Sequence, residues 1–415
     1  MPATSTSDTA PRSAAPDMRS GPLAGVRILD MATVVAAPFA CTLCADLGAE
    51  VVKLELPDGS DALRTLAPVK GRHALYWKVT NRGKRGITLD VRKAEGRALL
   101  LRLLPQFDVL VENFRTGTLE RWGLDLATLQ RANPQLTVLR LTGFGQTGPY
   151  AARPGFARIF EAMSGFAHLT GEADGRPQHM NYPLGDMVAG LFGAFSIAAA
   201  VADRRAHPRE CGREIDLSAT EAMLRMLEPL AAEFEQLGQV RCRAGSRATY
   251  TAPSNIYRTK DQCWITLVAS SEPIFRRLCQ AMGRPALASD PRFGSSQQRM
   301  LHIDALDGAI ERWCATLACA ELAQVLEQHE VPFGKVYAID DVLADPHLQA
   351  RQAIIRLPDP DLGELPAPCA VPRFSGFAPQ IPRSGPALGE HNEQVFGALG
   401  LGADELACLR SAQVI

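Results

Sequence analysis

The stretch "GVRILDMATVVAAPFACTLCADLGAEVVKLE", residues 25–55, contains two strand patterns with a helix pattern between them. The runs VRILD (26–30) and AEVVKLE (49–55) are short and largely apolar, which is typical of buried strands. The intervening APFACTLCADLG (37–48) places Pro38 in a first helical turn and Gly48 where a helix C-terminus favours glycine. Because a crossover helix joins parallel strands, the stretch predicts a βαβ unit.

The alternation of strand and helix patterns continues to about residue 145. NRGKRGITLD (81–90) leads to Asp90, which we expect to cap the helix VRKAEGRALLLRLL (91–104) before Pro105 ends it. FDVLVENF (107–114) and LTVLRLTGFG (136–145) follow as further strands. Strands separated by helices predict the α/β class, with a Rossmann-like layer built on a parallel sheet.

The sequence lacks the usual devices for holding a nucleotide on such a sheet. After the first strand comes MATVVAAP (31–38) where a dinucleotide-binding protein carries GxGxxG, and the chain contains no P-loop. Binding of NAD therefore stays an alternative that rests on the fold alone. Any other ligand that carries a nucleotide must be held in another way.

The pattern changes after residue 225, which predicts a second domain. A long apolar helix (186–205), a strand REIDLS (213–218) and a helix with a Ser218/Glu221 capping box precede the change. A hairpin that turns at Lys260–Asp261 and amphipathic helical segments follow it. We expect a disordered tail at 1–20, a large domain at 21–225, a smaller α+β domain with linkers at 226–339, and a C-terminal segment at 340–415 that returns to the large domain.

Composition restricts the partners and the compartment. The formal net charge is −1 over 415 residues, so neither a nucleic acid nor an anionic membrane is an expected partner. The longest apolar run, 187–202, is short for a membrane span, and the Ser/Thr/Ala/Pro-rich opening does not resemble a signal peptide. We expect a cytoplasmic protein.

The ten cysteines have no spacing typical of a disulfide scaffold, which fits reduced thiols. Cys41 and Cys44 form a CxxC inside a helical pattern, but the sequence has no second pair to complete a metal site. We favour a packing role for this pair over metal binding or redox chemistry, and we expect no bound metal.

Seven motifs, taken together and in order, carry a resemblance to a known family. They are the opening stretch quoted above, NRGKRGITLD, VENFRTGTLERWG, LTGFGQTGPY, RPGFARIFEAMSGFAHLTG, PLGDMVAG and APSNIYRTKD. From Gly21 to Ile415 the chain resembles the family III CoA-transferases, the group that contains formyl-CoA transferase and the carnitine CoA-transferases, together with α-methylacyl-CoA racemase.

The resemblance implies a site and an assembly. The family's catalytic aspartate matches Asp186, in LGDMVAG. CoA or acyl-CoA enters as a substrate and not as a permanent cofactor, and a carboxylic acid is the other substrate. Family members form interlocked homodimers with the active site at the subunit interface. The family's CoA-binding positions match Val35, Ala36, Asn81, Arg82, Lys84, Arg85, Asn113, Phe114, Arg115 and Arg121.

The residues themselves are compatible with this chemistry. NRGKR places three cations within five residues, which suits the phosphates of CoA, although a solvated basic loop has the same composition. A carboxylate can carry CoA between acids through a covalent relay, provided that it is ionised. An aspartate at a helix N-terminus meets that requirement, although Asp186 could equally be a plain N-cap.

The chain departs from the family pattern at three places. The acid/base histidine of the racemase branch lies thirty positions before the aspartate, where this chain has Phe156. Val35 replaces a glutamine of formyl-CoA transferase. In RAGSRATYTAP (243–253), where formyl-CoA transferase has a run of glycines, Gly245 stands alone.

The resemblance is greatest to the branch that uses succinyl-CoA or mesaconyl-CoA with dicarboxylates such as malate or citramalate. Arg158, Arg243 and Arg247 would suit a second carboxylate, with Phe156 beside them in the substrate site. An acyl-CoA racemase or epimerase is the rival enzyme, and a non-catalytic acyl-CoA-binding paralogue is the alternative from another class.

Overall fold

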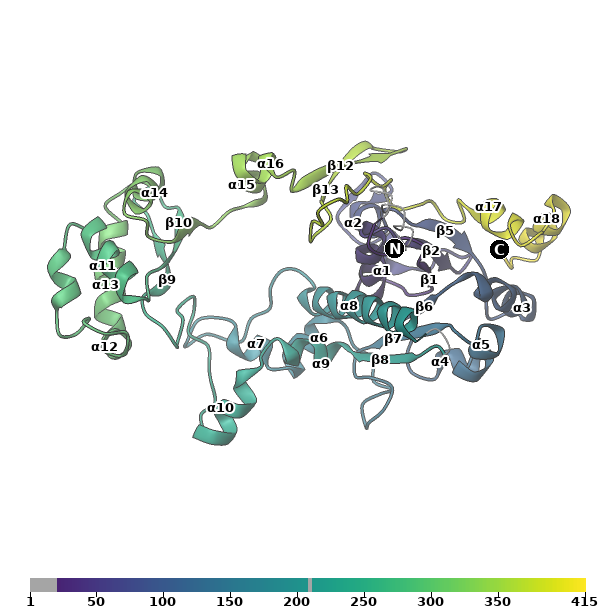
Figure 1. Ribbon diagram of the computed structural model, residues 1–415, viewed down its shortest axis with the longest axis horizontal. Helices are drawn as coiled ribbons and strands as arrows, with labels where there is room; N and C mark the ends of the chain where they lie inside the picture. The colour runs from purple at the N-terminus through teal and green to yellow at the C-terminus, as the bar shows by residue number, and fades with distance from the viewer. Residues whose placement is uncertain (1–20, 208–210) are drawn as a thin grey trace, which may run out of the picture. The chain divides into compact units, whose positions relative to one another are not determined.

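The computed structural model describes residues 21–207 and 211–415 (Figure 1). The tail expected at 1–20 lies outside these residues. The chain forms two compact units. The large unit comprises the chain up to Phe160, Tyr182–Arg225 and Ile354–Ile415, and the small unit comprises Glu161–Asn181 and Met226–Ala353.

A six-stranded sheet forms the centre of the large unit. Its strands are β1 Arg27–Asp30, β2 Glu50–Glu55, β5 Arg85–Thr88, β6 Val109–Glu112, β7 Thr137–Thr142 and β8 Glu214–Ser218. They lie in the order β5-β2-β1-β6-β7-β8, and every neighbouring pair is parallel. This is the strand order of the Rossmann fold, so the predicted layer is confirmed. The order reverses between β1 and β6, and ligands of such sheets bind at the carboxyl ends beside that point.

Two helices pack closely on one face of the sheet. They are α1 Ala36–Asp46 and α8 Leu184–Ala206, which lie side by side. A Cβ on Gly190 would lie 2.6 Å from the Ala36 carbonyl oxygen, so glycine is what lets the helices approach. By length and composition alone α8 could cross a membrane, and in the large unit its small residues face α1.

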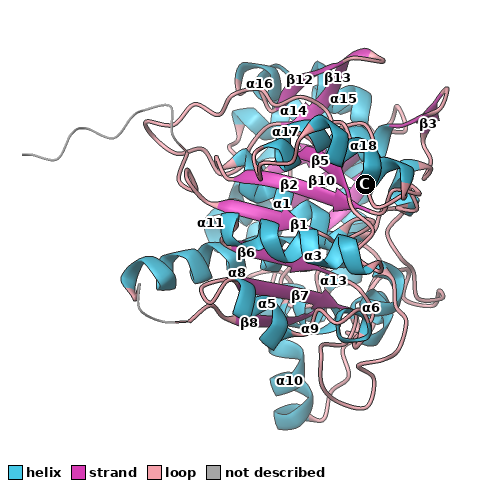
Figure 2. Cartoon of the chain, turned by 90° about the vertical axis from the view of Figure 1, so that its right-hand side faces the viewer, coloured by secondary structure: helices cyan, strands magenta, loops and turns pink. Residues whose placement is uncertain are grey.

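The opposite face carries the main apolar core. Helices α3 Ala94–Leu103 and α5 Leu126–Ala132 cover it (Figure 2), and the C-terminal α17 Asn392–Gly397 and α18 Ala403–Ser411 add side chains to the same core. The large unit also contains β3 Val69–Lys70, β4 His73–Ala74, α2 Leu75–Thr80, α4 Thr118–Arg121, α9 Ala219–Arg225 and the 3-10 turns η1 Ala62–Arg64 and η2 Leu104–Gln106, and α6 Ala157–Met163 spans its boundary with the small unit.

The prediction that Asp90 caps α3 is wrong. Helix α3 begins at Ala94 after Lys93, not directly after Asp90. The carboxylate of Asp90 instead accepts hydrogen bonds from the backbone and the guanidinium of Arg92. The Ser218 cap of α9 is confirmed, because the backbone N–H of Glu221 donates to Ser218 Oγ over 3.2 Å.

The small unit has the expected α+β character. Its antiparallel sheet has the order β11 (Phe333–Lys335), β10 (Trp264–Val268), β9 (Ser254–Arg258). Strands β9 and β10 form the expected hairpin around Lys260–Asp261. Segment 161–181 and the helices up to Ala350 belong to this unit, whereas we expected its limits at 226 and 339. Its elements are α7 Phe166–Leu169, α10 Pro229–Leu237, β9 Ser254–Arg258, β10 Trp264–Val268, α11 Glu272–Ala281, η3 Pro285–Ser289, α12 Ser296–Leu301, α13 Ile303–Cys314, α14 Cys319–Gln328, β11 Phe333–Lys335, α15 Ile339–Ala344 and α16 Pro346–Ala350.

The C-terminal segment returns to the large unit through a hairpin. Strands β12 Ile354–Asp359 and β13 Gly363–Pro368 pair antiparallel. Leu357 and Leu365 of this hairpin pack with Leu75 and Val79 of α2. The chain from 354 onward therefore completes a unit that begins at the other end of the sequence.

The CxxC lies inside α1 and serves packing. Cys41 and Cys44 are both buried, and burial raises the pKa of both thiols, that of Cys44 to about 12. Thiolate, the reactive and metal-binding form, is therefore scarce at neutral pH.

We expect Cys41 and Cys44 to resist alkylation by iodoacetamide at pH 8 in the folded protein, because they are buried and protonated. Cys211 and Cys408 are exposed and serve as internal controls that react quickly. Peptide mass spectrometry over a time course reads each site. Modification of Cys41 or Cys44 at the rate of Cys408 would contradict the packing role.

Candidate active site

A pocket of about 330 Å³ lies at the carboxyl ends of the central strands, within the large unit. The loop after β1 and the loop after β6 supply two of its walls, so it sits where the strand order reverses. The end of β7, residues 151–160 and the first turn of α8 complete it. The lining residues are Thr33, Val34, Val35, Ala36, Asn113, Phe114, Arg115, Thr116, Leu141, Thr142, Gly143, Ala151, Arg153, Pro154, Gly155, Phe156, Phe160 and Asp186.

Asp186 lies in the first turn of α8 and lines this pocket. The helix begins at Leu184 with Pro183 at the N-cap position, so the interpretation of Asp186 as the N-cap is wrong. As the third helical residue, Asp186 is partly buried and stands at the positive end of a 23-residue helix. That position favours a negatively charged carboxylate.

The N-terminus of α1 opens into the same pocket. Val35 is its N-cap residue and, among the described residues, no side chain caps the helix. Pro38 in the first turn has no N–H, so the backbone amides of Ala36 and Ala37 are the donors available there. The pocket thus has a carboxylate on one helix N-terminus and amide donors on another.

The loop that precedes α1 has an unusual backbone conformation. Val34 has a φ of 64°, in the left-handed region, which costs a non-glycine residue roughly 1–2 kcal/mol. Its backbone N–H donates to Asp61 Oδ1 over 3.0 Å. The side-chain amide of Asn113 clamps the preceding residue, since it accepts from Thr33 N and donates to Thr33 O, each over 2.8 Å.

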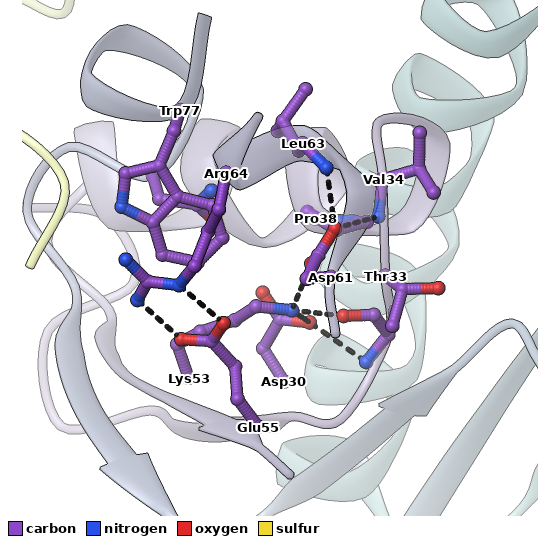
Figure 3. Close-up of polar contacts among 12 residues, drawn as sticks. Asp30, Thr33, Val34, Pro38, Lys53, Glu55, Asp61, Leu63, Arg64 and Trp77 are labelled. Atoms are coloured by element: carbon purple, nitrogen blue, oxygen red, sulfur yellow. Dashed lines mark hydrogen bonds and ion pairs between the residues drawn. The ribbon is translucent and has the colours of Figure 1, made fainter. Parts of the chain in front are cut away.

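Buried charges support this loop from inside the unit (Figure 3). Lys53 Nζ lies 3.6 Å from Asp30 Oδ1 and 3.8 Å from Asp61 Oδ2, and it donates to the Ala32 carbonyl. Lys84 Nζ donates to Asp30 Oδ2 over 2.8 Å and to the Pro38 carbonyl over 2.7 Å. Two lysines and two aspartates therefore fix the backbone on both sides of Val34.

The loop after β6 has a buried ion pair of its own. Arg140 of β7 donates to Glu112 Oε1 over 2.9 Å, and Glu112 Oε2 accepts from the backbone N–H of Phe114 over 2.7 Å. Burial raises the pKa of Glu112 although Arg140 opposes the shift. Glu112 therefore fixes the start of a pocket wall without lining the pocket itself.

The structure brings six of the residues predicted from the sequence into the pocket with Asp186. They are Val35, Ala36, Asn113, Phe114, Arg115 and Phe156. Arg121 is exposed at the end of α4, where it donates to Thr118 Oγ1 over 2.7 Å. Arg158 is exposed on α6 and is not among the lining residues.

The cations of the NRGKR segment do not line the pocket of Asp186, and each is paired with a protein carboxylate. Arg82 is buried and paired with Asp46, and Lys84 is buried as described above, with Asn81 Oδ1 as a further acceptor. Arg85 pairs with Glu50 over 3.0 Å. The segment is therefore not a solvated basic loop, and its binding to the phosphates of CoA stays a prediction.

Arg243 and Arg247 belong to the small unit, where both bind protein groups. Arg247 pairs with Asp304 and Asp307, each over 2.8 Å. Arg243 donates to the carbonyl oxygens of Gly175 and His168 over 3.1 and 2.9 Å. These partners favour a structural role over recognition of a substrate carboxylate.

Two polar residues near the carboxylate were missed from the sequence. Burial raises the pKa of Tyr76 first, and the neighbouring Tyr182 and Asp186 raise it further, so its hydroxyl stays a proton donor. Thr142 lines the pocket at the end of β7, and its buried Oγ1 has no hydrogen-bond partner among the described residues. The position of Thr142 in the second half of a predicted strand (136–145) was the available signal, whereas Tyr76 stands in none of the seven motifs.

The fold and this pocket define an α/β enzyme with a carboxylate at the ligand-binding edge of a Rossmann-type sheet. The comparison with protein families then identifies the chain. The model of CoA-transferase family III matches residues 23–392, so the chain belongs to this family and is a CoA-transferase.

Curated relatives and a solved structure agree. The chain is 42% identical over 397 residues to succinyl-CoA–D-citramalate CoA-transferase of Chloroflexus aurantiacus, which covers 95% of this chain and 98% of the relative. It is 39% identical over 399 residues to the beta subunit of succinyl-CoA–L-malate CoA-transferase of the same organism, with the same coverage of both chains. A CaiB/BaiF family protein from Brucella suis superposes with a TM-score of 0.81 at 33% identity, over 92% of this chain and 100% of that one.

We expect Gly190→Ala to destabilise the protein by about 1–3 kcal/mol, as overpacking of a close contact does. The added Cβ would lie 2.6 Å from the Ala36 carbonyl and would force apart the two helix N-termini that meet at the pocket. Activity should therefore fall together with stability. Urea unfolding and steady-state kinetics measure the two effects.

Gly397→Ala is the matched control, because Gly397 also lies in a helix but a Cβ added to it would meet nothing within 4 Å. We expect this change to be neutral or slightly stabilising. Equal effects of the two substitutions would contradict the close packing of α1 against α8.

Proposed function

We propose that this CoA-transferase moves CoA from a dicarboxylic acyl-CoA, with succinyl-CoA the first candidate, to a small dicarboxylic acid through Asp186. One observation carries the proposal. Asp186 lines a single pocket with the uncapped N-terminus of α1, at the carboxyl edge of the sheet. A nucleophile and donors for the charge that it generates are thus present together.

The relay begins when a carboxylate oxygen of Asp186 attacks the carbonyl carbon of the donor thioester. The carbon–sulfur bond breaks, which gives a mixed anhydride on Asp186 and a free CoA thiolate. The thiolate attacks the Asp186 carbonyl of the anhydride, releases the donor acid and leaves an aspartyl-CoA thioester. The acceptor carboxylate reverses both steps, so CoA is both substrate and carrier and no water is consumed.

Each tetrahedral intermediate of this relay carries a negatively charged oxygen. The amide of Ala36, which lines the pocket at the start of α1, is available to donate to such an oxygen, and it needs no reorganisation because the loop before it is fixed. The dipole of α8 meanwhile favours the ionised nucleophile. The N-terminus of α8 thus stabilises the charge of the nucleophile, and the N-terminus of α1 stabilises the charge of the intermediates.

The preference for dicarboxylates rests on the relatives and on two cations in the pocket. The names of both Chloroflexus relatives include succinyl-CoA and a dicarboxylic acceptor. Arg115 and Arg153 line the pocket of Asp186, and both side chains are exposed to an incoming ligand. One of them is available for the second carboxylate of the acid and the other for CoA.

Racemisation at the α-carbon is the rival reaction. Phe156 lines the pocket at the position that carries the acid/base histidine in the racemase branch, and its ring cannot exchange a proton. None of the described residues that line the pocket is a histidine. These features support transfer over racemisation, and the Asp186 carboxylate in the pocket argues against a non-catalytic paralogue.

We also propose that the enzyme is a cytoplasmic homodimer. Leu191, Phe195, Ala199 and Ala202 form an exposed apolar stripe on one face of α8. A second copy of the chain would cover this stripe. The free thiols of the chain suit a reducing compartment.

We expect intact wild-type protein, mixed with succinyl-CoA, to gain the mass of CoA less one water while free succinate is released. Asp186→Asn should form no adduct and should lose transfer activity by at least about a thousandfold, since the nucleophile is removed. Intact-protein mass spectrometry and an exchange assay between acids measure both.

Asp203→Asn is the control on the same helix, because Asp203 pairs with Arg213 outside the pocket. It should form the adduct normally. Adduct formation by Asp186→Asn, or its absence from wild type with every acyl-CoA tested, would contradict the proposed function. Deuterium exchange at the α-carbon of a 2-methylacyl-CoA would instead favour the racemase.

The dimer is tested by Phe195→Glu, which places a charge on the exposed stripe of α8. We expect it to shift the protein from dimer to monomer in analytical ultracentrifugation, because a buried charge without a partner is costly. Leu301→Glu is the matched control, since Leu301 and Phe195 are both 69% exposed. A monomeric wild type, or a dimer unaffected by Phe195→Glu, would contradict this assembly.

A further inference from the structure

The strained residue of the pocket loop is held by side chains that do not line the pocket. Val34, with its φ of 64°, precedes the N-cap residue of α1 and so sets the direction in which the first amides of that helix point. A β-branched residue does not adopt this conformation without outside support. The surroundings of its backbone must supply that support.

Asp61 supports the strained backbone at the N–H of Val34. Its Oδ1 accepts from the backbone N–H of Val34 and from that of Leu63, each over 3.0 Å. Its side chain is only 2% exposed, and it is not among the residues that line the pocket of Asp186. The hydrogen bond to Val34 joins residues 27 positions apart, so local chain geometry does not explain it.

Lys53 supplies the second part. Its side chain is fully buried, and its Nζ donates to the Ala32 carbonyl and lies 3.8 Å from Asp61 Oδ2. Asp61 and Lys53 thus hold the backbone on either side of Thr33, one at an N–H and the other at a carbonyl (Figure 3). The ion pair also orients the carboxylate of Asp61 toward Val34.

We propose that Asp61 and Lys53 are positioning residues for CoA transfer. They act through the strained Val34, because they keep the N-terminal amides of α1 aimed at the pocket of Asp186. This inference rests on the proposed function, in which those amides stabilise negatively charged intermediates. Neither side chain contacts the substrate.

The test uses Asp61→Ala in the full-length enzyme. We expect kcat to fall by roughly tenfold to a hundredfold with little change in the KM for succinyl-CoA, because the misplaced donors act on the transition state and not on the bound substrate. Asp61→Asn keeps an acceptor for Val34 and should recover part of the loss. If Asp61→Ala does not fold, Asp61→Asn carries the test, with a several-fold lower kcat expected.

Arg64→Met is the matched control in the same segment. Arg64 pairs with the buried Glu55 over 2.7 Å and stacks on Trp77, and its side-chain hydrogen bonds within the described residues go to Glu55 and the Pro386 carbonyl and not to Val34. Thermal unfolding should show a loss of stability, while kcat should stay within about twofold of wild type. A drop in kcat equal to that of Asp61→Ala would make Asp61 a merely structural residue.

A second background isolates the role of strain. Glycine adopts a positive φ without penalty, so in a Val34→Gly enzyme the further change Asp61→Ala should lower kcat by only about twofold. A loss as large as in the wild-type background would overturn the proposal. A wild-type kcat in those Asp61 variants that fold would also overturn the proposal.

The two proposals fail in different ways. If wild type forms no CoA adduct with any acyl-CoA, the proposed function is wrong, and the positioning role falls with it. If wild type forms the adduct and the Asp61 variants form it at the wild-type rate, the function stands and only the positioning role is wrong.

Discussion

The large unit depends on one buried carboxylate, Asp30, which ends β1 between the ammonium groups of Lys53 and Lys84. Although burial raises its pKa, the two lysines hold the pKa of Asp30 below its ordinary value, so it stays charged. Breaking such a buried pair by removing one partner costs about 3–5 kcal/mol. Lys53 donates a hydrogen bond to the Ala32 carbonyl in the pocket loop, and Lys84 donates one to the Pro38 carbonyl in α1. Asp30 is therefore connected to both segments through its lysine partners. The pocket loop at the switch point of the sheet and the first turn of α1 are therefore both held by lysines that pair with Asp30.

Much of the fold could be predicted because its signals are local. The βαβ pattern of residues 25–55, with Pro38 in the first turn and Gly48 after the helix, is what the structure contains. The start of α3 could not be predicted, because the carboxylate of Asp90 binds Arg92 and the helix begins later, at Ala94. The extent of the small unit was also missed, since the assignment of 161–181 depends on packing with residues distant in the sequence.

The site residues show the same contrast between features signalled by the local sequence and features set by residues distant in the chain. Motif resemblance identified Asp186 and both walls of its pocket, because those residues stand in contiguous stretches. It could not show that Arg82 and Lys84 are buried and paired, because their partners Asp46 and Asp30 lie 36 and 54 positions away in the sequence. The strain at Val34 was equally hidden, since a positive φ at a valine follows from tertiary support and not from propensity.

The central claim is that acyl transfer passes through an anhydride on Asp186. The most direct test is to let the enzyme turn over with an acceptor acid labelled with oxygen-18 in its carboxylates, and then to weigh the proteolytic peptide that contains Asp186. The account predicts that this peptide gains labelled oxygen, because the last step returns one acceptor oxygen to the aspartate. Turnover that leaves the Asp186 peptide unlabelled would contradict the account.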